Sequence, residues 1–195
     1  MKTLCLIALF LIINAGKPPD ETYTFQNTKW GMSIEEVMEN VDFIPVNMDE
    51  NTLVYQARIL KKNSQVVYRF VDSKLSEIQY TIQEIRPNDY DSIRDYNVIK
   101  KKLSKHYGPP SIDEHFWKDE LFKDNKGDWG IAVSLGQLFF NSEWETPNAH
   151  IRSILIGKDY NITCGIQYLP KSEEKQNEVQ NSSSSSKIPK DKPAG

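Results

Sequence analysis

Residues 52–85 read TLVYQARILKKNSQVVYRFVDSKLSEIQYTIQEI, and this stretch predicts the centre of a β-sheet. Apolar and polar residues alternate in its first run, 52–60, and its third, 75–85, as they do in half-buried strands. The alternating residues are Leu53, Tyr55, Ala57 and Ile59, followed by Ile78, Tyr80 and Ile82. The middle run, 65–71, alternates imperfectly, with Val67 and Phe70 around Tyr68. Polar turns at 61–64 and 72–74 join the runs into an antiparallel set.

A helix is predicted on each side of these strands. Ser33 and Glu36 have the spacing of a capping box, so a helix should begin there and end before Pro45. A longer helix is predicted over 91–106, because its apolar residues form one stripe. That stripe consists of Ile93, Tyr96, Ile99, Leu103 and Tyr107. The sequence Gly108-Pro109-Pro110 ends the helix, since proline cannot continue it.

Strand patterns return after a polar stretch at 111–128. The predicted strands are 129–135, 137–144, 150–156 and 161–168, with turn residues between them. The whole order is therefore helix, three strands, helix, and three or four strands. We predict an α+β fold whose antiparallel sheet has two helices on one face. The halves are either parts of one continuous unit or two tandem α-β-β-β units, 23–86 and 87–170.

The two ends of the chain differ in composition from the predicted domain. Residues 1–16 are typical of a secretory signal peptide: Lys2, an apolar run, and then small residues. The run is too short for a membrane-spanning helix, which needs roughly 20 apolar residues. Residues 171–195 are rich in Ser, Lys and Glu, and we expect a disordered low-complexity tail there. Residues 17–170 then form a single α+β domain.

Charge and cysteine content limit the classes of function. The chain has 24 basic and 27 acidic residues and no strongly basic stretch, so nucleic-acid binding is not expected. Cys5 lies at the start of the apolar run, whereas a lipoprotein cysteine follows it, so no permanent membrane anchor is predicted. Cys164 falls in a strand pattern and should be a buried apolar residue without a disulfide. The chain contains no phosphate-binding loop or nucleophile elbow, and no cofactor is predicted.

Two sets of candidate site residues remain. Four aromatic residues of the second half are candidates for contact with a partner: Trp117, Trp129, Trp144 and Phe140. The second set is a pair, His115 and Asp119, in the acidic stretch Asp113–Glu120. Residues four apart share a face if the segment is helical, so this pair is the candidate for a metal site.

Two short motifs are similar to known families. The sequence Trp30-Gly31-Met32-Ser33-x-Glu35-Glu36-Val37 resembles the helix start of small secreted bacterial proteins and of the BamE/SmpA outer-membrane assembly lipoproteins. The helix end Leu103-x-x-x-Tyr107-Gly108-x-Pro110 resembles the closing Leu-Gly-x-Pro of those folds. The alternation of helix and hairpins is similar to beta-lactamase-inhibitor-protein-like domains. The resemblance implies an envelope protein, although this chain lacks the lipid-anchoring cysteine of BamE.

These observations predict an exported, non-catalytic binding or interaction module of the bacterial envelope or extracellular space. Its partner would be another envelope protein or a small ligand. Two alternatives stay open. One is an extracytoplasmic metal-dependent hydrolase that uses the stretch Asp113–Glu120 with His115 and Asp119. The other is a carrier that holds a small ligand in an apolar cavity.

Overall fold

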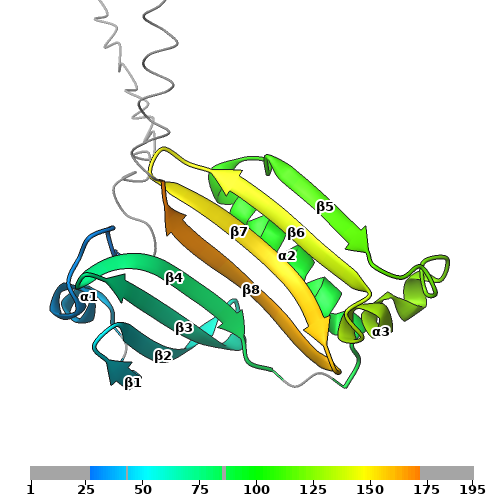
Figure 1. The fold of residues 1–195 in the computed structure, drawn as a ribbon, viewed down its shortest axis with the longest axis horizontal. Helices are drawn as coiled ribbons and strands as arrows, with labels where there is room; N and C mark the ends of the chain where they lie inside the picture. Colours follow the sequence, from blue (N-terminus) through cyan, green and yellow to red (C-terminus); the bar gives the residue numbers. More distant parts are fainter. Residues whose placement is uncertain (1–26, 43, 85–86, 172–195) are drawn as a thin grey trace, which may run out of the picture.

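The computed structural model describes residues 27–42, 44–84 and 87–171. In this part of the chain, eight strands form one antiparallel sheet in the order β1-β2-β3-β4-β8-β7-β6-β5 (Figure 1). The strands are β1 Pro45–Asp49, β2 Thr52–Ile59, β3 Lys62–Val71, β4 Lys74–Ile82, β5 Ile112–Trp117, β6 Leu138–Glu145, β7 Ala149–Lys158 and β8 Asn161–Pro170. The helices are α1 Ile34–Asn40, α2 Tyr90–Tyr107 and α3 Trp129–Ser134, and the 3-10 turn η1, Lys126–Asp128, precedes α3. The predicted α+β class with an antiparallel sheet is confirmed.

The sheet consists of two sequential meanders. Strands β1 to β4 follow one another along the sheet, and β5 to β8 do the same from the opposite edge. The meanders meet where residues 78–81 of β4 pair with residues 165–168 of β8. The predicted signal peptide, 1–16, and all of the predicted tail except Lys171 lie outside the described residues.

The hairpin of β2 and β3 shows why the middle strand of the run 52–85 was misread from the sequence. Ile59 pairs with Lys62, so the turn contains only Leu60 and Lys61, and both of these have positive φ. Two-residue turns of this kind match the twist of antiparallel strands. The predicted polar turn at 61–64 is therefore wrong. Strand β3 starts earlier than expected, and its buried residues alternate regularly at Ser64, Val66, Tyr68 and Phe70, while Val67 faces the other side.

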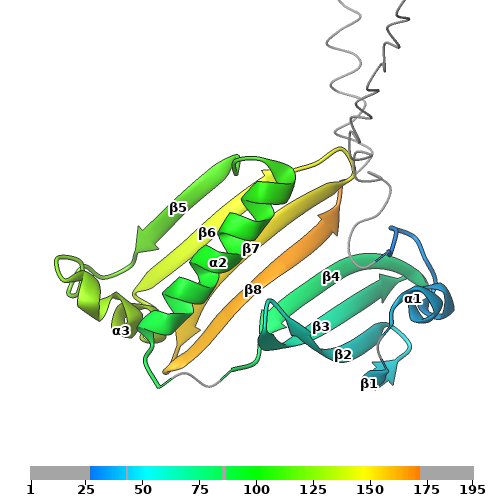
Figure 2. The same ribbon diagram turned by 180° about the vertical axis from the view of Figure 1, so that it is seen from behind.

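The structure confirms the predicted start of the first helix and the predicted end of the second. Ser33 caps α1 as expected: the Glu36 backbone N–H donates to Ser33 Oγ over 3.3 Å, and Ser33 N–H donates to the Glu36 carboxylate over 2.8 Å. Helix α2 ends at Gly108, whose φ of +86° favours glycine. In Figure 2, α2 lies along one face of β6, β7 and β8, whereas α1 lies at the far end of the sheet beside β3 and β4.

Helix α3 replaces the strand predicted at 129–135. This run is apolar at most positions, and a short apolar run has no periodicity that separates a strand from a buried helix. Glycine lets α3 approach its neighbours closely. A Cβ on Gly130 would lie 2.3 Å from the backbone nitrogen of Tyr90 in α2, and one on Gly157 would lie 1.9 Å from the carbonyl oxygen of Val133. The expectation that 111–128 is only a polar stretch is also wrong, because β5 occupies its first part.

Helices α2 and α3 leave the other face of β5–β8 free of helices among the described residues (Figure 1). The alternation of side chains identifies this surface. Ser142 and Trp144 bond to Tyr96 of α2 and to Gly108, so Asn141, Glu143 and Glu145 point to the opposite side. We call that side the open face.

Candidate binding site: an aromatic cluster beside strand β5

Four aromatic rings meet on the helix-bearing face beside β5. We call His115, Trp117, Trp129 and Phe140 the aromatic cluster. His115 stacks on Phe140 with ring centroids 5.6 Å apart and an interplanar angle of 29°. The Trp129 ring lies 5.5 Å from His115, 5.6 Å from Trp117 and 6.3 Å from Phe140. Three of the four aromatic residues predicted to contact a partner therefore lie together.

The register of the sheet and the position of α3 bring these rings together. His115 is directly opposite Phe140 in the β5–β6 pair, so their side chains share a face. Trp117, two residues along β5, lies on that face as well. Trp129 is the first residue of α3, and its indole N–H donates to the carbonyl of Lys123 over 3.0 Å. The ring of Tyr96 in α2 packs against that of Phe140, with the two ring centroids 5.4 Å apart.

The cluster is packed on the core on one side and reaches solvent on the other. Trp117, Trp129 and Phe140 are partly buried against the core, and His115 is exposed. Lys126 lies over the Trp129 ring, with its ammonium group 5.7 Å from the centroid. Rings held in this way can contact a partner without losing much side-chain freedom.

A polar chain borders the cluster where α2 faces β5. The Tyr96 and Ser142 hydroxyl groups are hydrogen-bonded, and Ser142 Oγ donates to Asp113 over 2.8 Å. Asp113 also accepts from Lys100 Nζ, at 3.0 and 3.1 Å. Burial raises the pKa of the Tyr96 phenol, although the bond with Ser142 opposes the shift, so this hydroxyl stays neutral. This series of hydrogen bonds fixes β5 against α2 and holds the aromatic cluster in place.

Trp144 lies apart from the other predicted aromatic residues. It is 1% exposed, and its indole N–H donates to the carbonyl of Gly108 over 3.0 Å. It therefore packs in the core and ties β6 to the end of α2.

The metal-site alternative depended on a helical segment. His115 lies instead in strand β5, and Asp119 follows the end of that strand. Residues four apart in an extended strand are separated by about 13 Å, so helical spacing does not apply. The Asp119 carboxylate accepts the backbone N–H of Leu121 over 3.0 Å. The described residues contain no group of three His, Cys, Asp or Glu side chains that could hold a metal ion. Cys164 is buried, as its strand pattern predicted.

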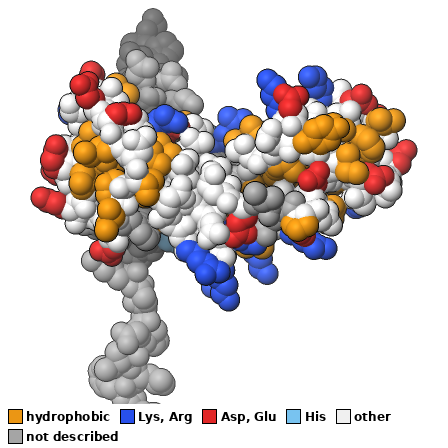
Figure 3. All heavy atoms as spheres, turned by 90° about the horizontal axis from the view of Figure 1, so that it is seen from below, with side chains coloured by type: hydrophobic (Ala, Val, Ile, Leu, Met, Phe, Trp, Pro, Cys, Tyr) orange, Lys and Arg blue, Asp and Glu red, His pale blue; other side chains and the backbone are white. Residues whose placement is uncertain are grey.

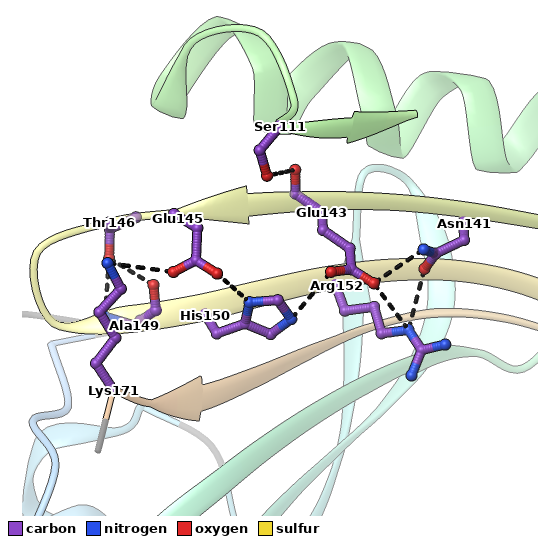
Figure 4. Close-up of polar contacts among 9 residues, drawn as sticks. All are labelled: Ser111, Asn141, Glu143, Glu145, Thr146, Ala149, His150, Arg152 and Lys171. Atoms are coloured by element: carbon purple, nitrogen blue, oxygen red, sulfur yellow. Dashed lines mark hydrogen bonds and ion pairs between the residues drawn. The ribbon is translucent and has the colours of Figure 1, made fainter. Parts of the chain in front are cut away.

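Sequence reasoning missed a row of charged residues on the open face (Figure 4). The row consists of Glu143, Glu145, His150, Arg152 and Lys171. His150 Nδ1 lies 2.7 Å from Glu145 and Nε2 lies 3.5 Å from Glu143. Glu143 also lies 3.7 Å from Arg152 Nε, and Glu145 lies 3.2 Å from Lys171 Nζ. Part of the signal was present in the sequence, because Glu143 and Glu145 alternate before the predicted turn and His150 and Arg152 alternate after it, but only the β6–β7 register pairs them.

The charged row is arranged as mutual pairs. Partial burial tends to raise the pKa of Glu145, but hydrogen bonds from His150 and Lys171 outweigh it and leave that pKa below its ordinary value. Both ring nitrogens of His150 face carboxylates. Neither nitrogen is thus directed at a hydroxyl or thiol that it could activate, and the row has the character of a structural network.

A cavity of about 460 Å³ lies where the two meanders meet. Its lining is largely polar and includes Thr81, Asp89, Ser92, Asn161 and Thr163. This lining differs from the apolar cavity that the carrier alternative requires.

No protein-family model, no curated protein and no solved structure is similar enough to this chain to count as a match. The resemblance to BamE/SmpA and beta-lactamase-inhibitor-protein-like domains therefore stays a prediction. In the described ranges, no helix has both the length and the apolar character needed to cross a membrane.

Proposed function

We propose that the protein is an exported, non-catalytic module that binds another envelope protein through the aromatic cluster. The observation that supports this function is the convergence of Trp117, Trp129 and Phe140 from β5, α3 and β6 onto one partly exposed surface. Export rests on the signal-like residues 1–16.

The cluster has the physical properties of a contact surface. Its rings are already packed on each other and on the core, so binding orders few additional side chains. Aromatic side chains remove a large apolar area from water when a partner covers them. The ammonium group of Lys126 beside Trp129 adds positive charge at the rim, which favours a partner surface that combines apolar and acidic side chains.

The architecture that we infer is a variant of the predicted tandem α-β-β-β units: each unit is a helix followed by four antiparallel strands, with α3 inserted between β5 and β6 of the second unit. The symmetric strand order, with β4 and β8 meeting at the centre, supports it. In this arrangement the first unit supplies a rigid extension of the sheet, and the second unit carries the aromatic cluster. In the same proposal, α1 and α2 cover the same face of the sheet.

The test uses the purified full chain as bait against a native envelope extract, with three variants. Trp117→Ala and Trp129→Ala each remove one ring of the cluster. Tyr160→Ala is the matched control, because Tyr160 is an aromatic residue that is 74% exposed on the β7–β8 turn. We expect one partner to be retained by the wild type and by Tyr160→Ala and to be lost from both tryptophan variants, while circular dichroism stays unchanged. Equal retention by all four proteins contradicts the proposal.

A further inference from the structure

The two edges of the sheet differ in how well they are protected against pairing with another strand. An edge strand presents unpaired backbone N–H and C=O groups, and proteins usually protect it with proline, bulges or charges. Edge strand β1 begins with Pro45, and its register shifts between Pro45 and Asn47. Edge strand β5 pairs with β6 from Ile112 to Trp117 without a shift, and it contains no proline. Strand β5 is therefore the regular, accessible edge.

Apolar side chains gather at both ends of the molecule (Figure 3). The β1 end has Val46 and Met48, which are 60% and 56% exposed. The bulge at Pro45 nevertheless breaks the regular ladder there. At the other end, Ile112 and Phe116 of β5 are 40% and 51% exposed.

Alternate residues of β5 point their backbone N–H and C=O groups toward the free edge of the sheet. Lys118 N–H donates to the carbonyl of Gln137 over 2.7 Å, so residue 118 points its backbone groups at β6. In an antiparallel pair this direction alternates along the strand. Glu114 and Phe116 thus share the inward direction, and Asp113, His115 and Trp117 direct their N–H and C=O groups outward.

We propose that two copies of this chain associate by pairing their β5 strands in antiparallel fashion about a two-fold axis at Glu114. In this register Asp113 lies opposite His115 of the second copy, and Ile112 lies opposite Phe116 of the second copy. This register is one of those that the outward backbone groups allow, since Asp113 and His115 then sit in hydrogen-bonded positions, and the side chains of β5 select it among them. A two-fold axis makes each of these pairs occur twice.

The side chains of β5 are complementary to themselves in this register. On the open face, Ile112 and Phe116 cover each other's exposed apolar surface. On the helix-bearing face, the carboxylate of Asp113 meets the exposed imidazole of His115. Glu114 meets Glu114 of the second copy at the axis, and these like charges weaken the dimer. Because the exposed apolar pair and the Asp113–His115 pair both come from β5 itself, a second copy is the occupant that this edge fits.

The dimer would join two eight-stranded sheets into one and place the two aromatic clusters on either side of the join. This inference goes beyond the proposed function, because the cluster could bind a partner in a monomer as well as in a dimer. The dimer doubles the number of clusters that face the same side.

Sedimentation velocity of the full chain over a range of concentrations tests the inference. We expect a reversible monomer–dimer equilibrium. His115→Pro removes an outward N–H from each copy, and Phe116→Asp removes both Ile112–Phe116 pairs, so both variants should be monomeric. Glu114→Gln removes the central repulsion and should tighten the dimer about two- to fivefold. Val98→Asp is the matched control, because Val98 is an exposed apolar residue of α2 that is 46% accessible.

Circular dichroism of each variant checks that the monomer is folded, and Phe116→Asp decides the result if His115→Pro does not fold. A wild-type chain that is monomeric at every concentration overturns the inference. So does a dimer that Phe116→Asp leaves intact, or one that Val98→Asp weakens to the same degree.

Discussion

The ammonium group of Lys62 lies 3.0 Å from the carboxylate of Asp95 and joins strand β3 of the first meander to helix α2 of the second half. Glu84 lies 4.0 Å from the same ammonium group. The Asp95 side chain is only 8% exposed, and that of Lys62 is 26% exposed, so solvent screens the pair incompletely. Together with the short β4–β8 pairing, this contact fixes one half of the molecule relative to the other.

Replacing Lys62 with methionine should destabilise the fold by about 1–3 kcal/mol, because the buried Asp95 carboxylate loses the ammonium group that lies 3.0 Å from it. Chemical denaturation at neutral pH measures the free energy of unfolding. The matched control is Lys123→Met, which breaks the exposed pair with Glu120 and should change stability by less than about 1 kcal/mol. Equal effects of the two substitutions would mean that Lys62 does not hold the halves together.

Trp144→Phe should destabilise the protein by about 1–3 kcal/mol, although Trp144 is one of the four aromatic residues predicted to contact a partner. The substitution leaves a small cavity and removes the N–H that donates to the Gly108 carbonyl. Trp117→Phe, in the partly exposed cluster, should cost less than about 1 kcal/mol. Thermal unfolding of both variants checks this ranking, and a larger loss for Trp117→Phe would contradict the division into core and surface residues.

The elements that sequence reasoning predicted well are those in which local chemistry and packing agree. The Ser33–Glu36 capping box and the α2 stripe depend on short-range spacing, and the structure confirms both. Helix α3 was missed because its burial comes from contacts with α2 and β7, which lie far away in sequence. The strand β3 was misread because a two-residue turn with positive φ at Leu60 and Lys61 has no glycine or asparagine to mark it.

The candidate site was predictable by residue type and not by geometry. Trp117, Trp129 and Phe140 were named from their aromatic character, but their convergence depends on the β5–β6 register and on α3. His115 was assigned to a metal site on helical spacing, and the register places it in the aromatic cluster instead. The charged row needed the β6–β7 register, which pairs Glu143 with Arg152 and Glu145 with His150.

Gly157→Ala should be among the more damaging single substitutions, with a loss of about 1–3 kcal/mol or more. The added Cβ would lie 1.9 Å from the Val133 carbonyl oxygen and 3.0 Å from the Cα of Ser134, so α3 must move away from β7. Gly108→Ala provides the comparison, because its Cβ meets nothing within 4 Å and its cost of about 1–3 kcal/mol comes from the backbone conformation alone, with φ +86° and ψ −172°. Denaturant unfolding measures both losses. A smaller effect at Gly157 would indicate that α3 is loosely packed.

Glu145→Gln should reduce the loss of stability in acid. The folded-state pKa of Glu145 lies below its ordinary value of 4.5, because the bonds from His150 and Lys171 outweigh partial burial. A carboxylate with a lowered pKa stabilises the folded state above its unfolded pKa, and that contribution disappears as the pH falls from about 4.5 through the folded value. The wild type should therefore lose more free energy of unfolding than Glu145→Gln between neutral pH and pH values below 4.5. Glu50→Gln, which removes an exposed carboxylate outside the charged row, is the matched control. Denaturant titrations over that pH range give the comparison. Identical acid slopes for the wild type and Glu145→Gln would show that the contacts of His150 and Lys171 with Glu145 do not persist in solution.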